Sequence, residues 1–257
     1  MTFLADVLEA KRLEVERLRE DPPVIIPCEG RGAFAQALRG PGLSVIAEIK
    51  RASPSKGVLT ADLGVAKRVR AYEDGGARAI SCLTDRAFFG AHVSDFAEAR
   101  KASLPVLRKD FLIDELQIDQ SAAMGASAIL LIARILEQPR LVALLRHAEV
   151  RGLEALVEVH DESELDRALE AGASILGVNN RDLATLAVDP NRALRLRARI
   201  PKGVVSVSES GVRNRDDVKR IEDAGFDAVL IGEALSRSVA PAATLRELMG
   251  EMPLVTR

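Results

Sequence analysis

From residue 44 onward, short runs of apolar residues alternate with longer stretches in which apolar residues recur every three or four positions. The short runs are rich in β-branched residues and leucine and predict buried strands, whereas the longer stretches predict amphipathic helices. We expect strands near residues 44–49, 79–83, 105–108, 128–132, 154–158, 175–178, 204–207 and 228–231. We expect the helices that follow them near residues 62–75, 94–102, 114–124, 137–150, 161–171, 190–199, 214–224 and 240–250. The pattern therefore predicts eight βα units.

Four of the predicted helices end at a glycine shortly before the next strand, namely Gly76, Gly125, Gly172 and Gly225. Glycine suits the left-handed conformation that stops a helix and turns the chain. The stops recur at intervals of about 50 residues, and each interval holds two βα units. Parallel strands joined by right-handed helical crossovers most simply close into a barrel. The predicted fold class is α/β, a (β/α)8 TIM barrel.

The residues before the first predicted strand form an N-terminal helical extension. Apolar residues recur at helical spacing from Phe3 to Glu20, and a second short helix is expected from Ala33 to Arg39. Prolines and Gly30 between them predict an irregular link. No second domain boundary is evident, so we expect one domain over residues 1–257, with the extension at 1–43 and the barrel at 44–257.

Composition excludes several classes of protein. Of the 257 residues, 47% are hydrophobic, the net charge is −2, and there is one Tyr and no Trp, which argues against a nucleic-acid-binding face. No apolar run approaches the roughly 18 residues of a membrane span. The two cysteines, Cys28 and Cys82, support neither a disulfide framework nor a metal site and predict free thiols in a reducing, cytoplasmic setting. For oligomeric state we expect a monomer, with a weak dimer as the alternative.

Charged residues interrupt the apolar pattern at the ends of alternate predicted strands. Glu48 and Lys50 end the first strand, Lys109 follows the third, Glu158 ends the fifth and Glu209 follows the seventh. Inward side chains of such a barrel lie in layers contributed by alternate strands, so these residues are expected to converge at the mouth. A ring of carboxylates around lysines predicts proton transfer.

The sequence leaves the protonation of the lysines open. Neighbouring carboxylates favour the protonated form, whereas burial favours the neutral form, so a lysine here suits either an acid or a base. Taken singly, each of these charged residues is explained as well by a structural ion pair. Their joint occurrence on alternate strands favours a catalytic site.

Two glycine turns complete the predicted mouth. Gly211 follows the seventh strand and Gly232 the eighth, where exposed backbone N–H groups commonly bind phosphate in this fold, although tight turns explain them too. After the sixth strand, the amide of Asn179 can donate and accept, and Arg181 can bind a carboxylate or phosphate. Asn180 and Asp182 are interpreted as turn formers.

The three histidines are interpreted as surface or helix-cap residues. His92, His147 and His160 do not coincide with a predicted strand end that has acidic partners, and no metal-ligand spacing recurs. We therefore predict no metal site.

Six segments, taken in chain order, resemble the motifs of the indole-3-glycerol-phosphate synthase family. They are AEIKRASPSKG at 47–57, LRKDF at 107–111, LVEV at 156–159, GVNNRDL at 177–183, SESG at 208–211 and LIGEAL at 230–235. The resemblance covers nearly the whole chain from residue 3. It implies a lyase of tryptophan biosynthesis that converts 1-(2-carboxyphenylamino)-1-deoxyribulose 5-phosphate into indole-3-glycerol phosphate, CO₂ and water, without a metal or organic cofactor.

The resemblance also implies roles for individual residues. Lys109 corresponds to the general acid that protonates the substrate carbonyl oxygen, and Glu158 to a base acting in dehydration, although Glu48 and Lys50 have been given acid and base roles as well. Glu48 and Asn179 would orient Lys109 and the substrate hydroxyls. Lys50 and Arg181 are candidates for anionic groups of the substrate, and Glu209 for a polar contact.

Further residues are expected to hold the two ends of the substrate. Ser53, Ser210, Gly211 and Gly232 would hold its phosphate or carboxylate, and Glu233, where relatives carry Ser or Glu, is expected to contribute its N–H while its carboxylate turns away. A dry slot for the aryl ring is needed as well. Its candidates are Phe88, Phe89, Phe111, Leu130 and Leu183.

Two other functions would share part of this pattern. A sugar-phosphate isomerase of the phosphoribosylanthranilate isomerase type would share the phosphate glycines but would not need both lysines and all three glutamates. A non-catalytic phosphate-binding barrel would need none of them. The glycine-containing loop from Arg51 to Leu59 is expected to close over bound substrate.

Overall fold

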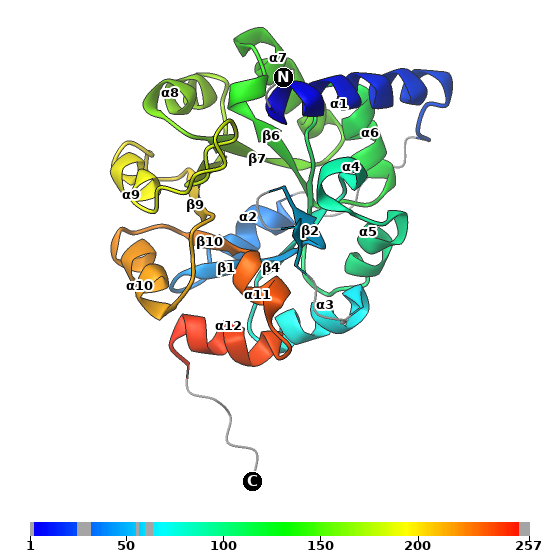
Figure 1. Cartoon of the computed structure of the whole chain (residues 1–257). Helices are drawn as coiled ribbons and strands as arrows, with labels where there is room; N and C mark the ends of the chain where they lie inside the picture. The colour runs from blue at the N-terminus through cyan, green and yellow to red at the C-terminus, as the bar shows by residue number, and fades with distance from the viewer. Residues whose placement is uncertain (1–2, 25–31, 55–56, 60–63, 252–257) are drawn as a thin grey trace.

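The computed structural model describes residues 3–24, 32–54, 57–59 and 64–251. Within them, eight parallel strands close into a barrel ringed by helices, which confirms the predicted (β/α)8 fold (Figure 1). The strands pair in chain order around the barrel, and the last pairs with the first. They are β1 (Ser44–Ile49), β4 (Ala79–Leu83), β5 (Val106–Lys109), β6 (Ala128–Ile132), β7 (Glu154–Val159), β8 (Ile175–Asn179), β9 (Val205–Glu209) and β10 (Ala228–Ile231).

A helix follows each barrel strand, within a few residues of its predicted position. These helices are α3 (Val65–Asp74), α5 (Val93–Ala99), α6 (Glu115–Ala123), α7 (Gln138–Val150), α8 (Glu162–Glu170), α9 (Arg192–Arg197), α10 (Arg215–Asp223) and α12 (Pro241–Met249). The four predicted glycine stops all have positive φ, between 76° and 90°. A short helix near Ala234 was also predicted, and it is α11 (Glu233–Arg237).

Four short elements were not predicted, and all of them follow the carboxyl ends of barrel strands. They are the antiparallel pair β2 (Ala52–Ser53) and β3 (Gly57–Val58), the helix α4 (Arg86–Phe89) and the 3₁₀ turn η1 (Ala133–Ile135). Elements this short carry no readable hydrophobic period.

Several barrel strands extend beyond their predicted ends. Lys109, Asn179 and Glu209 are the last residues of β5, β8 and β9, and β7 continues past Glu158 to Val159. In each case the added residue pairs through its backbone with a neighbouring strand, as Lys109 does with Leu83, Val159 with Val178 and Asn179 with Glu209. The side chains of Glu48, Lys109, Glu158 and Glu209 therefore project from paired strands, whereas Lys50 follows the end of β1.

The N-terminal extension contains both predicted helices, α1 (Phe3–Glu20) and α2 (Ala33–Leu38). The helix α1 contacts α6 and crosses it (Figure 1), and its first residue, Phe3, reaches the carboxyl ends of the barrel strands. The helix α2 closes the amino-terminal end, where Phe34 and Leu38 are fully buried against the barrel interior. Its first N–H groups are capped by the Glu154 carboxylate, which accepts from Phe34 N at 2.7 Å. The division at residues 43 and 44 stays a prediction.

The core has two parts. Buried residues on the outer faces of the strands pack against the helices, and a second cluster fills the barrel interior. Cys82 is a free, buried cysteine, and burial raises the pKa of its thiol, whereas Cys28 lies outside the described residues. No helix in the described part of the chain combines the length and apolar character that a membrane crossing needs.

Candidate active site

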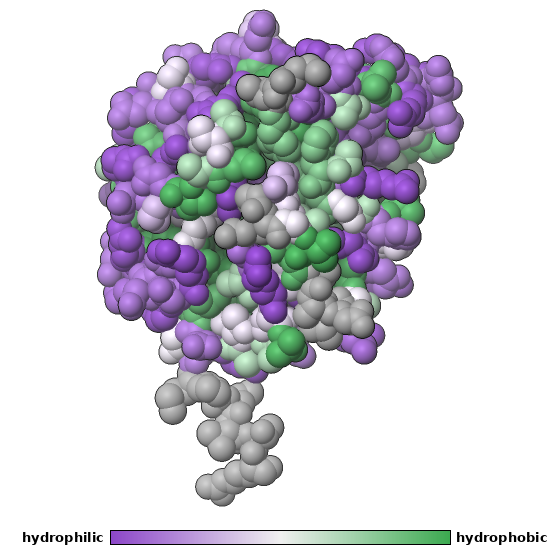
Figure 2. Space-filling model, viewed as in Figure 1, coloured by the Kyte–Doolittle hydropathy of each residue, from purple (hydrophilic) through white to green (hydrophobic). Residues whose placement is uncertain are grey.

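A cavity of about 830 Å³ opens at the carboxyl ends of the barrel strands. On the face that carries α11 and β2, hydrophilic residues dominate the periphery and apolar residues gather towards the middle (Figure 2). The cavity is lined by every residue proposed for the site in the sequence analysis except Phe88. The proposed site residues that line it are Glu48, Lys50, Ser53, Phe89, Lys109, Phe111, Leu130, Glu158, Asn179, Arg181, Leu183, Glu209, Ser210, Gly211, Gly232 and Glu233.

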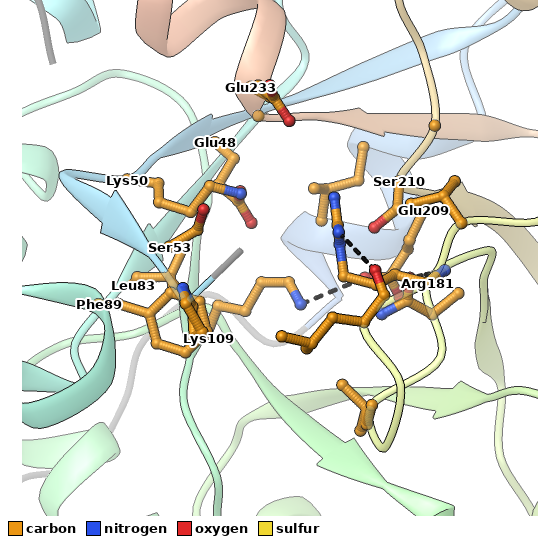
Figure 3. Close-up of a pocket in the computed structure, with 18 of the residues that line it drawn as sticks. Glu48, Lys50, Ser53, Leu83, Phe89, Lys109, Arg181, Glu209, Ser210 and Glu233 are labelled. Carbon is orange, nitrogen blue, oxygen red and sulfur yellow. Dashed lines mark hydrogen bonds and ion pairs between the residues drawn. The ribbon is translucent and has the colours of Figure 1, made fainter. Parts of the chain in front are cut away.

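Lys109 lies at the centre of the charged residues of this cavity. Its Nζ is 3.3 Å from Glu158 Oε2 and 3.3 Å from Glu209 Oε2. Figure 3 shows Lys50 and Lys109 reaching into the cavity from one side, opposite Glu209 and Arg181. Burial alone would lower the pKa of Lys109, but attraction by Glu158, Glu209 and Glu48 outweighs it and raises this pKa above its usual value. Lys109 is therefore protonated across the working pH range.

The two carboxylates beside Lys109 differ in pKa. Burial opposes ionisation of both, because their side chains are each 1% exposed. At Glu158 this effect is outweighed by attraction to Lys109 and by His160, so its pKa is lowered. At Glu209, burial and repulsion by Glu158 outweigh attraction to the shared lysine and raise the pKa to about 8. Near neutral pH the pair thus holds one ionised and one protonated carboxyl group.

Glu48 and Lys50 form a second ion pair in the same cavity. Lys50 Nζ is 2.7 Å from Glu48 Oε1, in keeping with two side chains on the same side of a strand. Gly232 lies so close that a Cβ there would overlap Glu48 Oε1 and come within 3.2 Å of Lys50 Nζ. The glycine after β10 thus makes room for this ion pair.

The turn after β9 has an unusual backbone. Ser210 has φ 64° and Gly211 has φ 93°, so two successive residues lie in the left-handed region, which a serine seldom adopts. Asn180 supports the turn by donating from Nδ2 to the Ser210 carbonyl at 3.0 Å. Consecutive residues in turns of this kind can direct backbone N–H groups to an anion.

Arg181 is held by the β8–α9 connection. Its Nη1 donates to the Leu186 carbonyl at 2.9 Å, and its N–H donates to Asn179 Oδ1 at 2.9 Å. Asp182 accepts from the N–H groups of Ala184 and Thr185, as predicted for a turn former, and also from Arg134 Nη1. The connection is therefore a hydrogen-bonded structure along one wall of the cavity.

The apolar part of the cavity includes Phe89 and Phe111, whose ring centroids are 6.2 Å apart. Phe88 was expected to join them but does not line the cavity. It packs instead edge-to-face on Phe3 of α1, with ring centroids 5.4 Å apart. In the four-residue helix α4, adjacent side chains point in different directions, so only one of the two phenylalanines faces the cavity.

The location of one of the three histidines differs from the prediction. His92 caps α5, as predicted, and His147 lies on α7 with Nε2 2.6 Å from Asp119 Oδ1. His160 is neither a surface residue nor a cap, because its side chain is fully buried between Glu158 and Glu164. The prediction ended the strand at Glu158, but β7 continues, so His160 lies on the same side as Glu158.

Two further predictions concern residues at the rim. Glu233 Oε1 is paired with Arg237 Nε at 3.3 Å, one turn later in α11. In the predicted closing loop, Arg51 is fixed by two hydrogen bonds to Asp95 of 2.6 Å each, while Ser55 and Lys56 lie outside the described residues. Closure of this loop and the N–H role of Glu233 stay predictions.

Lys11 of α1 is a buried cation that the sequence analysis missed. Its Nζ is 2.7 Å from Asp110 Oδ1, 2.8 Å from Glu14 Oε2 and 3.0 Å from Asp85 Oδ2. Asp110 follows Lys109, and Asp85 caps α4 by accepting from Phe88 N. Lys11 thus connects the N-terminal extension to two connections that border the cavity. No group of three or more metal-ligating side chains occurs in the residues described here.

Comparison with known proteins agrees with this geometry. A family model described as indole-3-glycerol phosphate synthase matches residues 4–248. The chain is 54% identical over 218 residues to indole-3-glycerol phosphate synthase 2 of Streptomyces coelicolor, with 84% of each chain covered. It is 49% identical over 250 residues to indole-3-glycerol phosphate synthase of Chlorobium phaeovibrioides, with 93% of this chain and 96% of that protein covered.

The chain belongs to the indole-3-glycerol phosphate synthase family. This confirms the resemblance seen in the six sequence motifs. Among solved structures, 3-hexulose-6-phosphate synthase from Salmonella typhimurium has a TM-score of 0.62 at 15% identity, covering 81% of this chain and 97% of that one. Thiamine phosphate pyrophosphorylase from Pyrococcus furiosus has a TM-score of 0.61 at 16% identity, covering 81% and 94%. At these identities the likeness concerns the barrel fold alone, and the synthase family membership rests on the sequence relatives.

Proposed function

We propose that this chain catalyses the ring closure, decarboxylation and dehydration of 1-(2-carboxyphenylamino)-1-deoxyribulose 5-phosphate to indole-3-glycerol phosphate. The observation that carries the proposal is Lys109, held between Glu158 and Glu209 in the cavity of a chain from this family. The pairing supplies a protonated amine beside one ionised carboxylate, as an acid and base catalyst requires.

In the first step, the aryl carbon that bears the carboxylate attacks the ketone carbon of the sugar chain. A carbon–carbon bond forms, and the electron pair of the carbonyl goes to its oxygen, which takes a proton from Lys109. The aryl carboxylate then leaves as CO₂, and the electron pair of the broken bond restores the aromatic ring. Lys109 suits this role because the surrounding carboxylates keep it protonated.

In the last step, the new hydroxyl group leaves as water and a proton leaves the neighbouring methylene carbon, which forms the double bond of the indole. We assign the removal of this proton to Glu158, whose lowered pKa keeps it ionised. The leaving hydroxyl group must be protonated as well. Lys109 and Lys50 are both candidates for that acid, and Glu48, which is paired with Lys50, is the alternative to Glu158 as the base.

The rest of the cavity suits a long substrate with one anionic group at each end. We assign its phosphate to the backbone of Ser210, Gly211, Gly232 and Glu233, and its carboxylate to Lys50, Arg181 and Ser53. Asn179 and Glu209 would contact the hydroxyl groups of the sugar chain. The aryl ring would lie among the apolar residues Phe89, Phe111, Leu130 and Leu183. A dry slot aligns its weakly nucleophilic carbon with the ketone.

The experiment that tests the function is to mix the purified protein with this substrate and follow the fluorescence of the indole product. The chain has no Trp and one Tyr, so its own emission interferes little. We expect a rise in indole fluorescence that saturates with substrate. Folded protein that produces no indole signal would refute the synthase assignment, and turnover of phosphoribosylanthranilate instead would establish the isomerase alternative.

We also propose that the chain acts in the cytoplasm as a monomer and needs neither metal nor organic cofactor. Charged residues surround the proposed reacting groups and supply the acid and base that the reaction needs. Full activity after dialysis against a metal chelator, together with a monomeric mass by light scattering, is the expected result. Loss of activity that returns with an added metal would contradict the cofactor part of the proposal.

A further inference from the structure

The carboxylate of Glu158 contacts a different basic side chain with each of its two oxygens. Its Oε2 lies 3.3 Å from Lys109 Nζ, and its Oε1 lies 3.4 Å from His160 Nε2. Neither Oε1 nor Nε2 has a hydrogen-bond partner of ordinary geometry, and both are buried. Nε2 and Oε1 are thus placed to form a hydrogen bond with each other once the distance between them shortens by a few tenths of an ångström.

The opposite side of the imidazole is held by Glu164 of α8. His160 Nδ1 lies 3.0 Å from Glu164 Oε2, and the same oxygen accepts the backbone N–H of His160 at 2.8 Å. Arg134 of η1 holds the other oxygen, with Nε 2.6 Å from Glu164 Oε1. The side chain of His160 therefore cannot rotate without breaking a buried set of contacts.

These contacts determine where the imidazole carries its protons. Because Nδ1 faces the Glu164 carboxylate, it bears a proton, so a neutral ring would direct the lone pair of Nε2 at ionised Glu158. An imidazolium donates to both carboxylates instead. Burial lowers the pKa of His160, but hydrogen bonds and attraction from Glu158 and Glu164 outweigh this effect and raise it to about 9.

The wider charge environment also favours the imidazolium. Glu158 faces it from β7 and Glu164 from α8, while Arg134 of η1 lies beyond Glu164 and Lys109 of β5 beyond Glu158. Arg134 is itself paired with Asp161 at 3.5 Å and with Asp182 at 3.0 Å. The nearest contacts of the ring are thus two carboxylates, and each cation near it is separated from it by one of them.

We propose that His160 is a positioning residue of the active site, in which Glu164 holds the imidazolium and the imidazolium holds Oε1 of Glu158, so that Oε2 alone faces Lys109 and the substrate. This inference rests on the proposed function, because it concerns the base assigned above. His160 itself is separated from the cavity by Glu158 and does not line it.

Two substitutions separate this role from a merely structural one. His160→Leu removes both contacts, whereas His160→Gln keeps a neutral amide that can reach Glu158 but cannot carry a charge. His147→Gln is the matched control, because His147 also pairs with a carboxylate, Asp119, but on the outer face of the barrel. The readout is the pH profile of kcat for each variant, with the thermal unfolding midpoint as the check on folding.

For His160→Leu we expect kcat at neutral pH to fall by roughly 10- to 100-fold, because the base is no longer fixed. We expect KM to change far less, and the acidic limb of the kcat profile to move up by about one pH unit, because Glu158 loses a cation. His160→Gln should recover part of kcat, and His147→Gln should match the wild type. An unchanged acidic limb in a folded His160→Leu variant, or a loss confined to KM, would overturn the proposal.

A second measurement does not depend on turnover. The chain has three histidines, so NMR can follow each imidazole through a pH titration, with assignment by single substitutions. We expect His160 to remain an imidazolium through pH 8 and to lose its proton near pH 9. A His160 ring that is neutral at pH 7 would overturn the proposal even if the enzyme is active. Wild-type protein without activity would instead refute the proposed function and leave this titration to decide the state of His160.

Discussion

Gly177 of β8 lies against the carboxylate of Glu209 of β9 so closely that a methyl group there would overlap Glu209 Oε1. Leu156 lies on the same side, with Cδ1 3.2 Å from the position that a Cβ would take. The absence of a side chain at Gly177 thus leaves room for the Glu209 carboxylate, whose other oxygen lies 3.3 Å from Lys109 Nζ. Gly177, which has no side chain, thereby determines where a titratable carboxyl group lies.

Gly177→Ala is therefore expected to displace Glu209 from Lys109 and to lower kcat by roughly tenfold or more. Overpacking should also lower the free energy of unfolding by about 1–3 kcal/mol. Gly40→Ala is the control, because a Cβ there meets only ordinary contacts of 3.8 and 3.9 Å. Steady-state kinetics and urea unfolding measure the two effects. Activity equal to that of the control would show that Glu209 can move without consequence.

The raised pKa of Glu209 predicts a specific pH dependence. Burial and repulsion by Glu158 place this pKa at about 8, so the carboxyl group is protonated below that pH and ionises above it. Glutamine resembles the protonated form, so Glu209→Gln should keep most of the activity at pH 7. It should also remove the titration near pH 8 from the profile of kcat/KM.

Glu209→Ala serves as the comparison, because it removes the group in both protonation states. It should lose activity at every pH. If Glu209→Gln is as inactive as Glu209→Ala at pH 7, then the ionised form of Glu209 is the one that functions.

Lys109→Ala should abolish turnover and leave substrate binding largely intact, because other residues are assigned to the phosphate and carboxylate. The pKa of Lys109 is raised, so in the wild type this amine should not limit activity at any pH below about 10. Equilibrium binding of substrate and single-turnover kinetics check the two parts. Lys101→Ala is the control, because Lys101 pairs with Glu98 on the exposed surface. Ordinary turnover by Lys109→Ala would reject its role as the acid.

Lys11→Met should destabilise the protein markedly. It leaves the carboxylates of Asp85 and Asp110, 3% and 1% exposed, without their shared cation, and breaking such a buried pair costs about 3–5 kcal/mol. The raised pKa of Lys11 means that its stabilising effect is present throughout the working range and is lost only as the pH rises through that pKa. Lys101→Met, at an exposed pair, should cost about 0.5 kcal/mol or less. Denaturant unfolding of both variants at pH 7 tests the difference, and equal stabilities would contradict it.

Most of the fold was predictable because its hydrophobic pattern is regular. Every barrel strand is rich in apolar residues and is separated from the next by a longer amphipathic stretch, so all eight were placed within two residues at either end. The strand ends were less predictable, since Lys109, Asn179 and Glu209 continue a hydrogen-bonded ladder without being apolar. Strand ends of this kind depend on a neighbouring strand that is distant in the sequence.

The candidate site was predictable where its residues follow the parity of the strands, as Glu48, Lys109, Glu158 and Glu209 do. His160 was missed, although it lies two positions after Glu158 and four before Glu164, a spacing that would have suggested a shared contact. Lys11 could not be found in this way, because its acidic partners come from distant strand ends that meet α1 only in the folded barrel. The position of Phe88 could not be predicted for the same reason, because its partner Phe3 is distant in the sequence and meets it only in the folded barrel.

The buried oxygens of Glu209 also affect the stability of the barrel. Both are shielded from water without a hydrogen bond of ordinary geometry, next to a second carboxylate that competes for the same lysine. Groups in this situation oppose folding, so the native state tolerates them only because the surrounding core is large. A search for more thermostable variants should therefore select apolar replacements at this position, and those variants would be more robust and less active. The carboxyl groups at the mouth of the barrel therefore lower the stability of the fold and are kept for the reaction.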